Sequence, residues 1–264
     1  MSKRIFFLSA LALIVSCTST KQTPVKVENL PEVKIEASAN TFKSYRASNT
    51  MSSDLVHTKL VVYFDWGRQQ LNGQATITLK PHFNPVMDVT LNARGMDILS
   101  VKLLDKNNEF KNVFHSYKND SLYVFFGGPA RPYTRDETYT LWIEYNAKPE
   151  ELEEGGSVAI SSDKGLYFIN ADGAEPDKPK QIWTQGETQS NSVWFPTIDS
   201  PNQRMTQEIY ITVDTIYKTL SNGLLMYSTD NHDGTRTDYW KQSLPAAPYL
   251  TMMAIGKYSI VKDR

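Results

Sequence analysis

Cysteine and histidine are scarce in this chain of 264 residues, which has one cysteine, Cys17, and four histidines. A single cysteine excludes an intrachain disulfide framework. The four histidines are scattered: no two form an H-x3-H pair, and none is followed by glutamate. Because a local zinc site needs such closely spaced ligands, we expect surface histidines and no metal ligands in this chain.

Other motifs that carry chemistry are also missing. Neither the G-x-S-x-G turn of serine hydrolases nor the phosphate-binding loop G-x-x-x-x-G-K-S/T occurs. Lys and Arg number 28 against 29 Asp and Glu, a net charge of -1. The chain therefore lacks the basic excess of a nucleic-acid-binding protein, and we expect no nucleic-acid partner. The acidic run 150–154 is typical of a solvated face rather than a calcium site.

The N-terminal segment has an apolar run that is too short to span a bilayer. Residues 2–4 (SKR) are basic, and residues 5–15 are apolar, as in a secretory signal. The run ends in LIVSC, which resembles a bacterial lipobox whose cysteine receives lipid, although a plain secretory signal remains the alternative. We predict a lipoprotein signal peptide over 1–16 and lipidation at Cys17. The protein would then be lipid-anchored to a bacterial membrane in the cell envelope, facing the periplasm or in the outer membrane.

Large apolar residues are few between the predicted anchor and residue 49. Residues 17–49 are rich in Ser, Thr, Lys, Pro and Glu, which predicts a flexible tether. From residue 50 the pattern changes to short segments in which apolar and polar side chains alternate, so we predict a folded domain over 50–264. The candidate strands are 54–65, 74–80, 86–91, 98–104, 121–126, 138–145, 207–214, 223–228, 235–241 and 249–255.

Long stretches at helical spacing are absent from the predicted domain. Residues 149–154 could form one helical turn, with proline and acidic residues at its start. The dipeptides Asn72-Gly73 and Asp233-Gly234 predict tight hairpin turns. Short strands separated by turn signals indicate an all-β fold, a saddle-like β-sandwich of mostly antiparallel strands.

The segment Thr184-Gln185-Gly186-Glu187 is the strongest candidate for binding chemistry. If it is extended, the side chains of Gln185 and Glu187 project to the same face, because side chains alternate along a strand. A carboxylate facing a free α-ammonium group makes a charge-assisted hydrogen bond, so the pair could hold the amino end of a peptide. An ordinary polar strand edge is the alternative.

The residues that flank this segment carry a family resemblance. The T-Q-G-E sequence is followed by WFPTIDSP at 194–201, by Arg204 and by Glu208; further matches lie at 91–93, 220–223, Trp240, 248–250 and 254–258. This pattern resembles the N-terminal domain of the aminopeptidase N family, which are zinc metallopeptidases of the gluzincin, leukotriene-hydrolase-like type. The resemblance covers residues 54–264. The sequence departs from the family at Thr197, where cysteine is frequent.

The resemblance implies roles for particular residues. Glu187 would anchor the α-amine of a peptide substrate, and Gln185 would contact its first residue. A catalytic domain with an H-E-x-x-H helix, a distant glutamate ligand and an oxyanion-stabilising tyrosine would follow Arg264, and none of these motifs occurs here. We therefore expect no catalytic residue and no metal in this chain, and zinc in the missing catalytic domain. The partners implied are a peptide N-terminus, the protein's own C-terminal catalytic domain and, through lipid, a membrane.

Several residues of the matching segment have structural interpretations. We expect the carboxylate of Asp199 to cap backbone N–H groups of a turn. Trp194 and Phe195 would fill the space beneath that turn, and Arg204 would pair with Asp199 or Glu208.

Two functions are compatible with these observations. The chain is either the N-terminal, substrate-anchoring part of a zinc-dependent aminopeptidase, inactive alone, or a complete non-catalytic surface lipoprotein. The second would bind peptides or a protein partner through its β face. The reading frame downstream of codon 264 discriminates between them.

Overall fold

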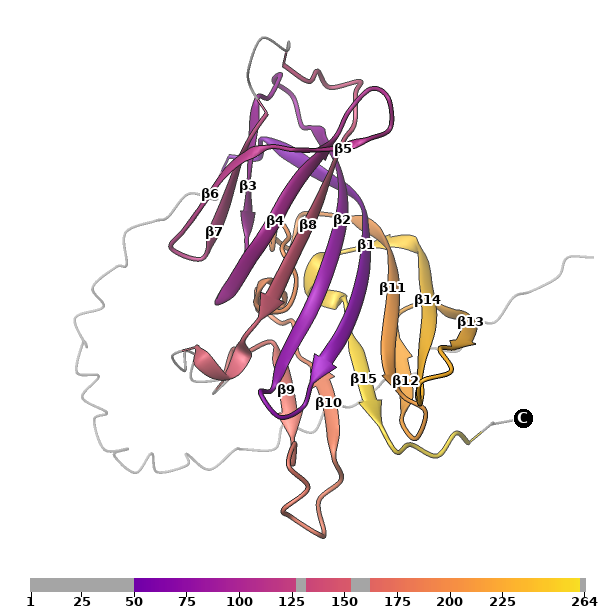
Figure 1. Ribbon diagram of the computed structural model, residues 1–264. Helices are drawn as coiled ribbons and strands as arrows, with labels where there is room; N and C mark the ends of the chain where they lie inside the picture. The colour runs from indigo at the N-terminus through magenta and orange to yellow at the C-terminus, as the bar shows by residue number, and fades with distance from the viewer. Residues whose placement is uncertain (1–49, 127–131, 153–161, 262–264) are drawn as a thin grey trace, which may run out of the picture. The chain divides into compact units, whose positions relative to one another are not determined.

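The computed structural model describes residues 50–126, 132–152 and 162–261 (Figure 1). The predicted signal peptide, Cys17 and the predicted tether lie outside these residues. Asn49–Arg264 form one compact unit. The secondary structure in the described ranges consists of β-strands and short 3-10 helices, so the all-β prediction is confirmed. No helix within these ranges is long and apolar enough to cross a membrane.

An eight-stranded sheet is the largest element of the fold (Figure 1). Its strand order is β13-β14-β11-β1-β2-β8-β4-β5. The strands are β1 (Ser53–Asp65), β2 (Gln70–Pro81), β4 (Met96–Leu104), β5 (Phe110–Asn112), β8 (Tyr139–Ala147), β11 (Met205–Asp214), β13 (Leu224–Asp230) and β14 (Thr235–Ala246). Neighbouring strands pair antiparallel except β1 and β11, which are parallel. This pair places the first strand of the domain beside β11, the first strand after the segment 184–204.

Two smaller antiparallel sheets complete the described structure. A four-stranded sheet has the order β12 (Lys218–Ser221), β15 (Met253–Gly256), β10 (Gln181–Thr184) and β9 (Leu166–Ile169). A three-stranded sheet joins β3 (Asp88–Asn92), β7 (Ser121–Phe125) and β6 (Phe114–Lys118). The 3-10 helices are η1 (Pro149–Glu151), η2 (Asn191–Val193) and η3 (Pro248–Leu250). The turn predicted at 149–154 is therefore present as η1.

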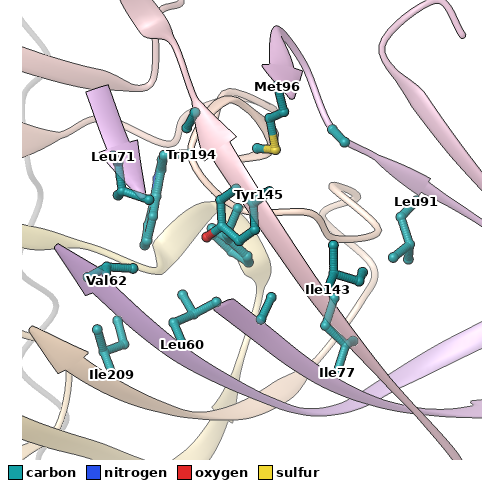
Figure 2. Close-up of a cluster of buried hydrophobic side chains, with 14 of the residues drawn as sticks. Leu60, Val62, Leu71, Ile77, Leu91, Met96, Ile143, Tyr145, Trp194 and Ile209 are labelled. Carbon is teal, nitrogen blue, oxygen red and sulfur yellow. The ribbon is translucent and has the colours of Figure 1, made fainter. Parts of the chain in front are cut away.

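The core is built from the inward faces of these strands. Buried and partly exposed residues alternate along β2 and β8, as expected for a sheet with one covered face. Figure 2 shows side chains of β1, β2 and β8 converging with Trp194. Trp194 and Phe195 are both fully buried and meet edge to face with ring centroids 4.5 Å apart, so their predicted packing role is confirmed.

The first hairpin turns at a different place from the one predicted. β1 ends at Asp65 and β2 begins at Gln70, so Asn72-Gly73 lies inside β2 and the prediction of a turn there is wrong. A Cβ at Gly73 would lie 2.4 Å from Cζ of Tyr145 on β8. Glycine stands here because the Tyr145 ring crosses the strand at this point. The second predicted hairpin is confirmed, since β13 and β14 are joined by 231–234, with Gly234 at φ +90°.

Candidate functional site

Strand β10 positions Gln185 at one end of the four-stranded sheet. The backbone N–H of Gln185 donates to the carbonyl of Gly165, 2.9 Å away, so the pairing with the β9 side continues one residue beyond β10. Ile182 and Thr184 are buried, whereas Trp183 is exposed and Gln185 partly exposed. Gln185 therefore keeps the alternation of the strand and lies on its outward face, beside Trp183.

A turn at Gly186 separates Glu187 from the strand. The carbonyl of Gly186 accepts a hydrogen bond from the N–H of Ser190, 2.9 Å away. A Cβ on Gly186 would lie 2.2 Å from the carbonyl oxygen of Tyr249, so only glycine permits this approach of η3. The segment is not extended through Glu187, the condition under which Gln185 and Glu187 would project to the same face. β10 ends at Thr184, and Glu187 lies in the turn, followed by a cis peptide bond.

Asn191 fixes this turn to the C-terminal part of the domain. Its side chain is fully buried, and Nδ2 donates to the carbonyls of Pro248 (2.7 Å) and Thr251 (2.8 Å). Its Oδ1 accepts a hydrogen bond of 2.8 Å from the indole Nε1 of Trp194. One amide thus joins the turn, η3 and the buried Trp194. The sequence alone does not reveal this residue because two of its partners, Pro248 and Thr251, lie 57 and 60 residues away.

Asp199 supports the same turn from the other side. Its Oδ2 accepts from the N–H of Ser192 (2.9 Å), and its carbonyl accepts from Nε2 of Gln189 (2.7 Å). Burial raises the pKa of this carboxyl above its ordinary value. The predicted capping role is confirmed, although the capped N–H lies seven residues earlier in the chain.

Arg204 forms neither of the two predicted ion pairs. Its Nη1 donates to the carbonyls of Pro201 (2.6 Å) and Gln203 (2.7 Å), which belong to the same turn. The prediction is wrong because these carbonyls lie next to the guanidinium in the folded turn. Glu208 instead lies 3.7 Å from Nζ of Lys241, across the β11–β14 pair.

The two predicted binding side chains are free in the described part of the chain. Within residues 50–126, 132–152 and 162–261, no hydrogen bond or ion pair engages the amide of Gln185 or the carboxylate of Glu187. By contrast, the polar side chains of Gln189, Asn191 and Asp199 all have partners. A fixed backbone thus presents an unpaired amide and an exposed carboxylate two residues apart, which can accept hydrogen bonds from a cationic ligand.

The described residues do not fit a zinc site. Among them, no group of three or more His, Cys, Asp and Glu side chains is placed to hold a metal ion. His57, for example, has its Nδ1 2.8 Å from the hydroxyl of Thr206 and its Nε2 4.0 Å from Glu208. Because structural and catalytic zinc sites need at least three protein ligands, no chemical step is assigned to a metal in this domain.

The fold and the site together define an all-β domain with exposed polar side chains at the end of β10. Its described residues include no group of three or more His, Cys, Asp and Glu side chains placed to hold a metal ion. Residues 54–250 match the Peptidase M1 N-terminal domain family. This match covers most of the chain, and the protein belongs to this family.

Solved structures and curated proteins also resemble this chain. A two-domain M1 zinc metallopeptidase mutant bound to L-arginine has a TM-score of 0.64 and 19% identity, over 78% of this chain and 42% of that chain. An M1 zinc metallopeptidase from Deinococcus radiodurans has a TM-score of 0.61 and 19% identity, with the same coverage. Transcription initiation factor TFIID subunit 2 of Gallus gallus is 29% identical over 102 residues, which are 38% of this chain and 9% of that protein. The chain therefore spans under half the length of these proteins.

Proposed function

We propose that residues 50–264 are the substrate-anchoring domain of a zinc-dependent aminopeptidase that removes N-terminal residues from peptides. Glu187 binds the α-ammonium group of the peptide, and Gln185 contacts its first residue. One observation carries the proposal: these two side chains are unpaired at the end of β10, while the polar groups around them hold the turn in place.

The chemistry of an amino terminus suits this pair. An α-ammonium group has donors only, and both an exposed carboxylate and an amide oxygen accept hydrogen bonds. The bond to the carboxylate is charge-assisted and is lost when the amine is acylated. Because Asn191 and Gly186 fix the turn, little backbone conformational entropy is lost when a peptide binds. The pair therefore recognises the free amino terminus of a peptide, as an exopeptidase requires.

The metal and its general base are assigned to a catalytic domain that follows residue 264. The 264 residues contain no H-E-x-x-H sequence, and the solved M1 zinc metallopeptidases are more than twice as long as the matched region. We expect the purified chain 1–264 to hydrolyse no aminoacyl p-nitroanilide, even with added Zn²⁺. Hydrolysis that Glu187→Ala abolishes would contradict this assignment, whereas hydrolysis that the variant leaves unchanged identifies a contaminating peptidase.

We also propose that Cys17 carries lipid and anchors the protein to a bacterial membrane in the cell envelope, through a tether over 17–49. The lipobox-like LIVSC sequence supports this proposal. Cells that express the chain and are fed radioactive palmitate should label it, and Cys17→Ala should remove the label. Equal labelling of the variant would contradict lipidation at this residue.

A non-catalytic function is the second candidate. It is favoured by the curated relatives, which are named as subunits of a transcription initiation factor. In that case the protein is a surface lipoprotein that binds peptides or a protein partner through its β face. An open reading frame with H-E-x-x-H downstream of codon 264 supports the enzyme, and a stop codon supports the binding protein.

A further inference from the structure

The outward face of the four-stranded sheet has an apolar row next to Gln185. The strand register places Leu220 opposite Ala254, Ala254 opposite Trp183, and Trp183 opposite Tyr167. The residues that alternate with them in β9, β10 and β15, such as Ile182 and Ile255, are buried on the other face. The row therefore crosses all four strands, and Trp183 is its member in β10, two residues before Gln185.

The end of this row on β10 and β9 is a stacked aromatic pair. The rings of Tyr167 and Trp183 are stacked, with centroids 4.7 Å apart and an interplanar angle of 16°. The hydroxyl of Tyr167 donates to the carbonyl of Ser162, 3.0 Å away, which fixes the orientation of its ring. Trp183 remains 36% exposed. Because its position is already fixed by the stack, a ligand that packs against it loses little side-chain entropy.

Tyr258 flanks the outward face of β10 at the end away from Gln185. The ring of Tyr258 lies over Gly256, where an added Cβ would be 2.8 Å from Cζ of Tyr258. The Tyr258 hydroxyl reaches Oε1 of Gln181 at 3.4 Å. Along β10 and the residue that follows it, the outward residues are thus Gln181 beside Tyr258, then Trp183, then Gln185. Gln185 directly precedes the turn that presents Glu187, and Trp183 lies two residues before Gln185.

We propose that Trp183, supported by Tyr167, receives the side chain of the peptide's first residue and selects aromatic or branched aliphatic residues over small ones. This inference rests on the proposed function of Gln185 and Glu187. Residues two apart on a strand are separated by about 7 Å. A phenylalanine whose α-amine is held at Glu187 and whose backbone is near Gln185 can span that distance, whereas an alanine side chain cannot.

Peptide binding to the whole chain, followed by NMR, tests the proposal. The chain has five tryptophans, and the indole N–H signal of Trp183 is identified by its loss in Trp183→Phe. The peptides are Phe-Ala-Ala, Ala-Ala-Ala and N-acetyl-Phe-Ala-Ala, titrated over the millimolar range. We expect Phe-Ala-Ala to shift the Trp183 signal and to bind roughly 5-fold to 10-fold more tightly than Ala-Ala-Ala. Trp183→Ala should reduce this preference to less than about twofold.

Control variants separate the two proposals. Leu225→Ala removes an exposed apolar side chain from β13 and should leave the preference unchanged. An unchanged thermal midpoint and the retained preference in Trp183→Phe exclude misfolding as the cause of the Ala result. Equal Kd values for the two free peptides, or an unmoved Trp183 signal, overturn the role of Trp183 while the anchoring role stands. Equal binding of the acetylated peptide, or no binding of any peptide, overturns both.

Discussion

Replacing Asn191 by alanine is expected to lower the free energy of unfolding by about 3–5 kcal/mol. The substitution leaves the carbonyl of Thr251 and the indole N–H of Trp194 without a partner in a buried place. It also removes one of the two hydrogen bonds to the carbonyl of Pro248, which still accepts from the N–H of Thr251. Each unsatisfied buried group costs about 1–3 kcal/mol. The turn that presents Glu187 would lose its attachment to η3, so peptide binding should weaken together with stability.

Urea unfolding followed by circular dichroism measures this effect. The matched control is Gln189→Ala, which removes a neighbouring amide that is exposed and makes one hydrogen bond, to Asp199. We expect the control to cost less than about 1 kcal/mol. An Asn191→Ala variant that is as stable as the control would show that the buried amide does not hold the turn in place.

Glu187→Gln should weaken the binding of a peptide with a free amino terminus roughly tenfold, or about 1.4 kcal/mol. The glutamine has nearly the same size and still accepts a hydrogen bond, but it lacks the charge that strengthens the bond to an α-ammonium group. Breaking a buried ion pair costs about 2–5 kcal/mol or more, and the exposed position of Glu187 places the expected loss below that range.

Asp177→Asn is the control for the change in net charge. Asp177 is exposed in the loop between β9 and β10, and its substitution removes one negative charge without touching the turn. Calorimetric titration should give the wild-type Kd for this variant. If both variants weaken binding equally, the effect of Glu187 is a general electrostatic one and not an anchoring contact.

Alternation of apolar and polar residues predicted the long strands well, because β2, β8 and β11 each have one buried face. The four-residue strands β9, β10 and β12 are too short for that signal. The error at Asn72-Gly73 has a different cause. Glycine marks both tight turns and close packing, and only the fold shows that Tyr145 lies against Gly73.

The candidate site could be predicted in part. The residue types of Gln185 and Glu187 indicated their chemistry, but their geometry depends on a turn at Gly186. Only glycine at this position allows the carbonyl of Tyr249 to approach, and no local pattern reveals that contact. Asn191 was missed for the same reason. Trp183 was seen only as part of the motif, and its stacking on Tyr167 follows from a strand register that the sequence does not encode locally.

The most direct test of the anchoring role compares one peptide with and without an acetylated amino terminus. The Kd of each form is measured by calorimetric titration against the wild-type chain and against Glu187→Gln. We expect the wild type to prefer the free amine roughly tenfold, and the variant to bind both forms with nearly equal, weak affinity. A wild-type chain that binds the acetylated peptide as tightly as the free one would contradict the assignment of Glu187 as the anchor of a peptide's amino terminus.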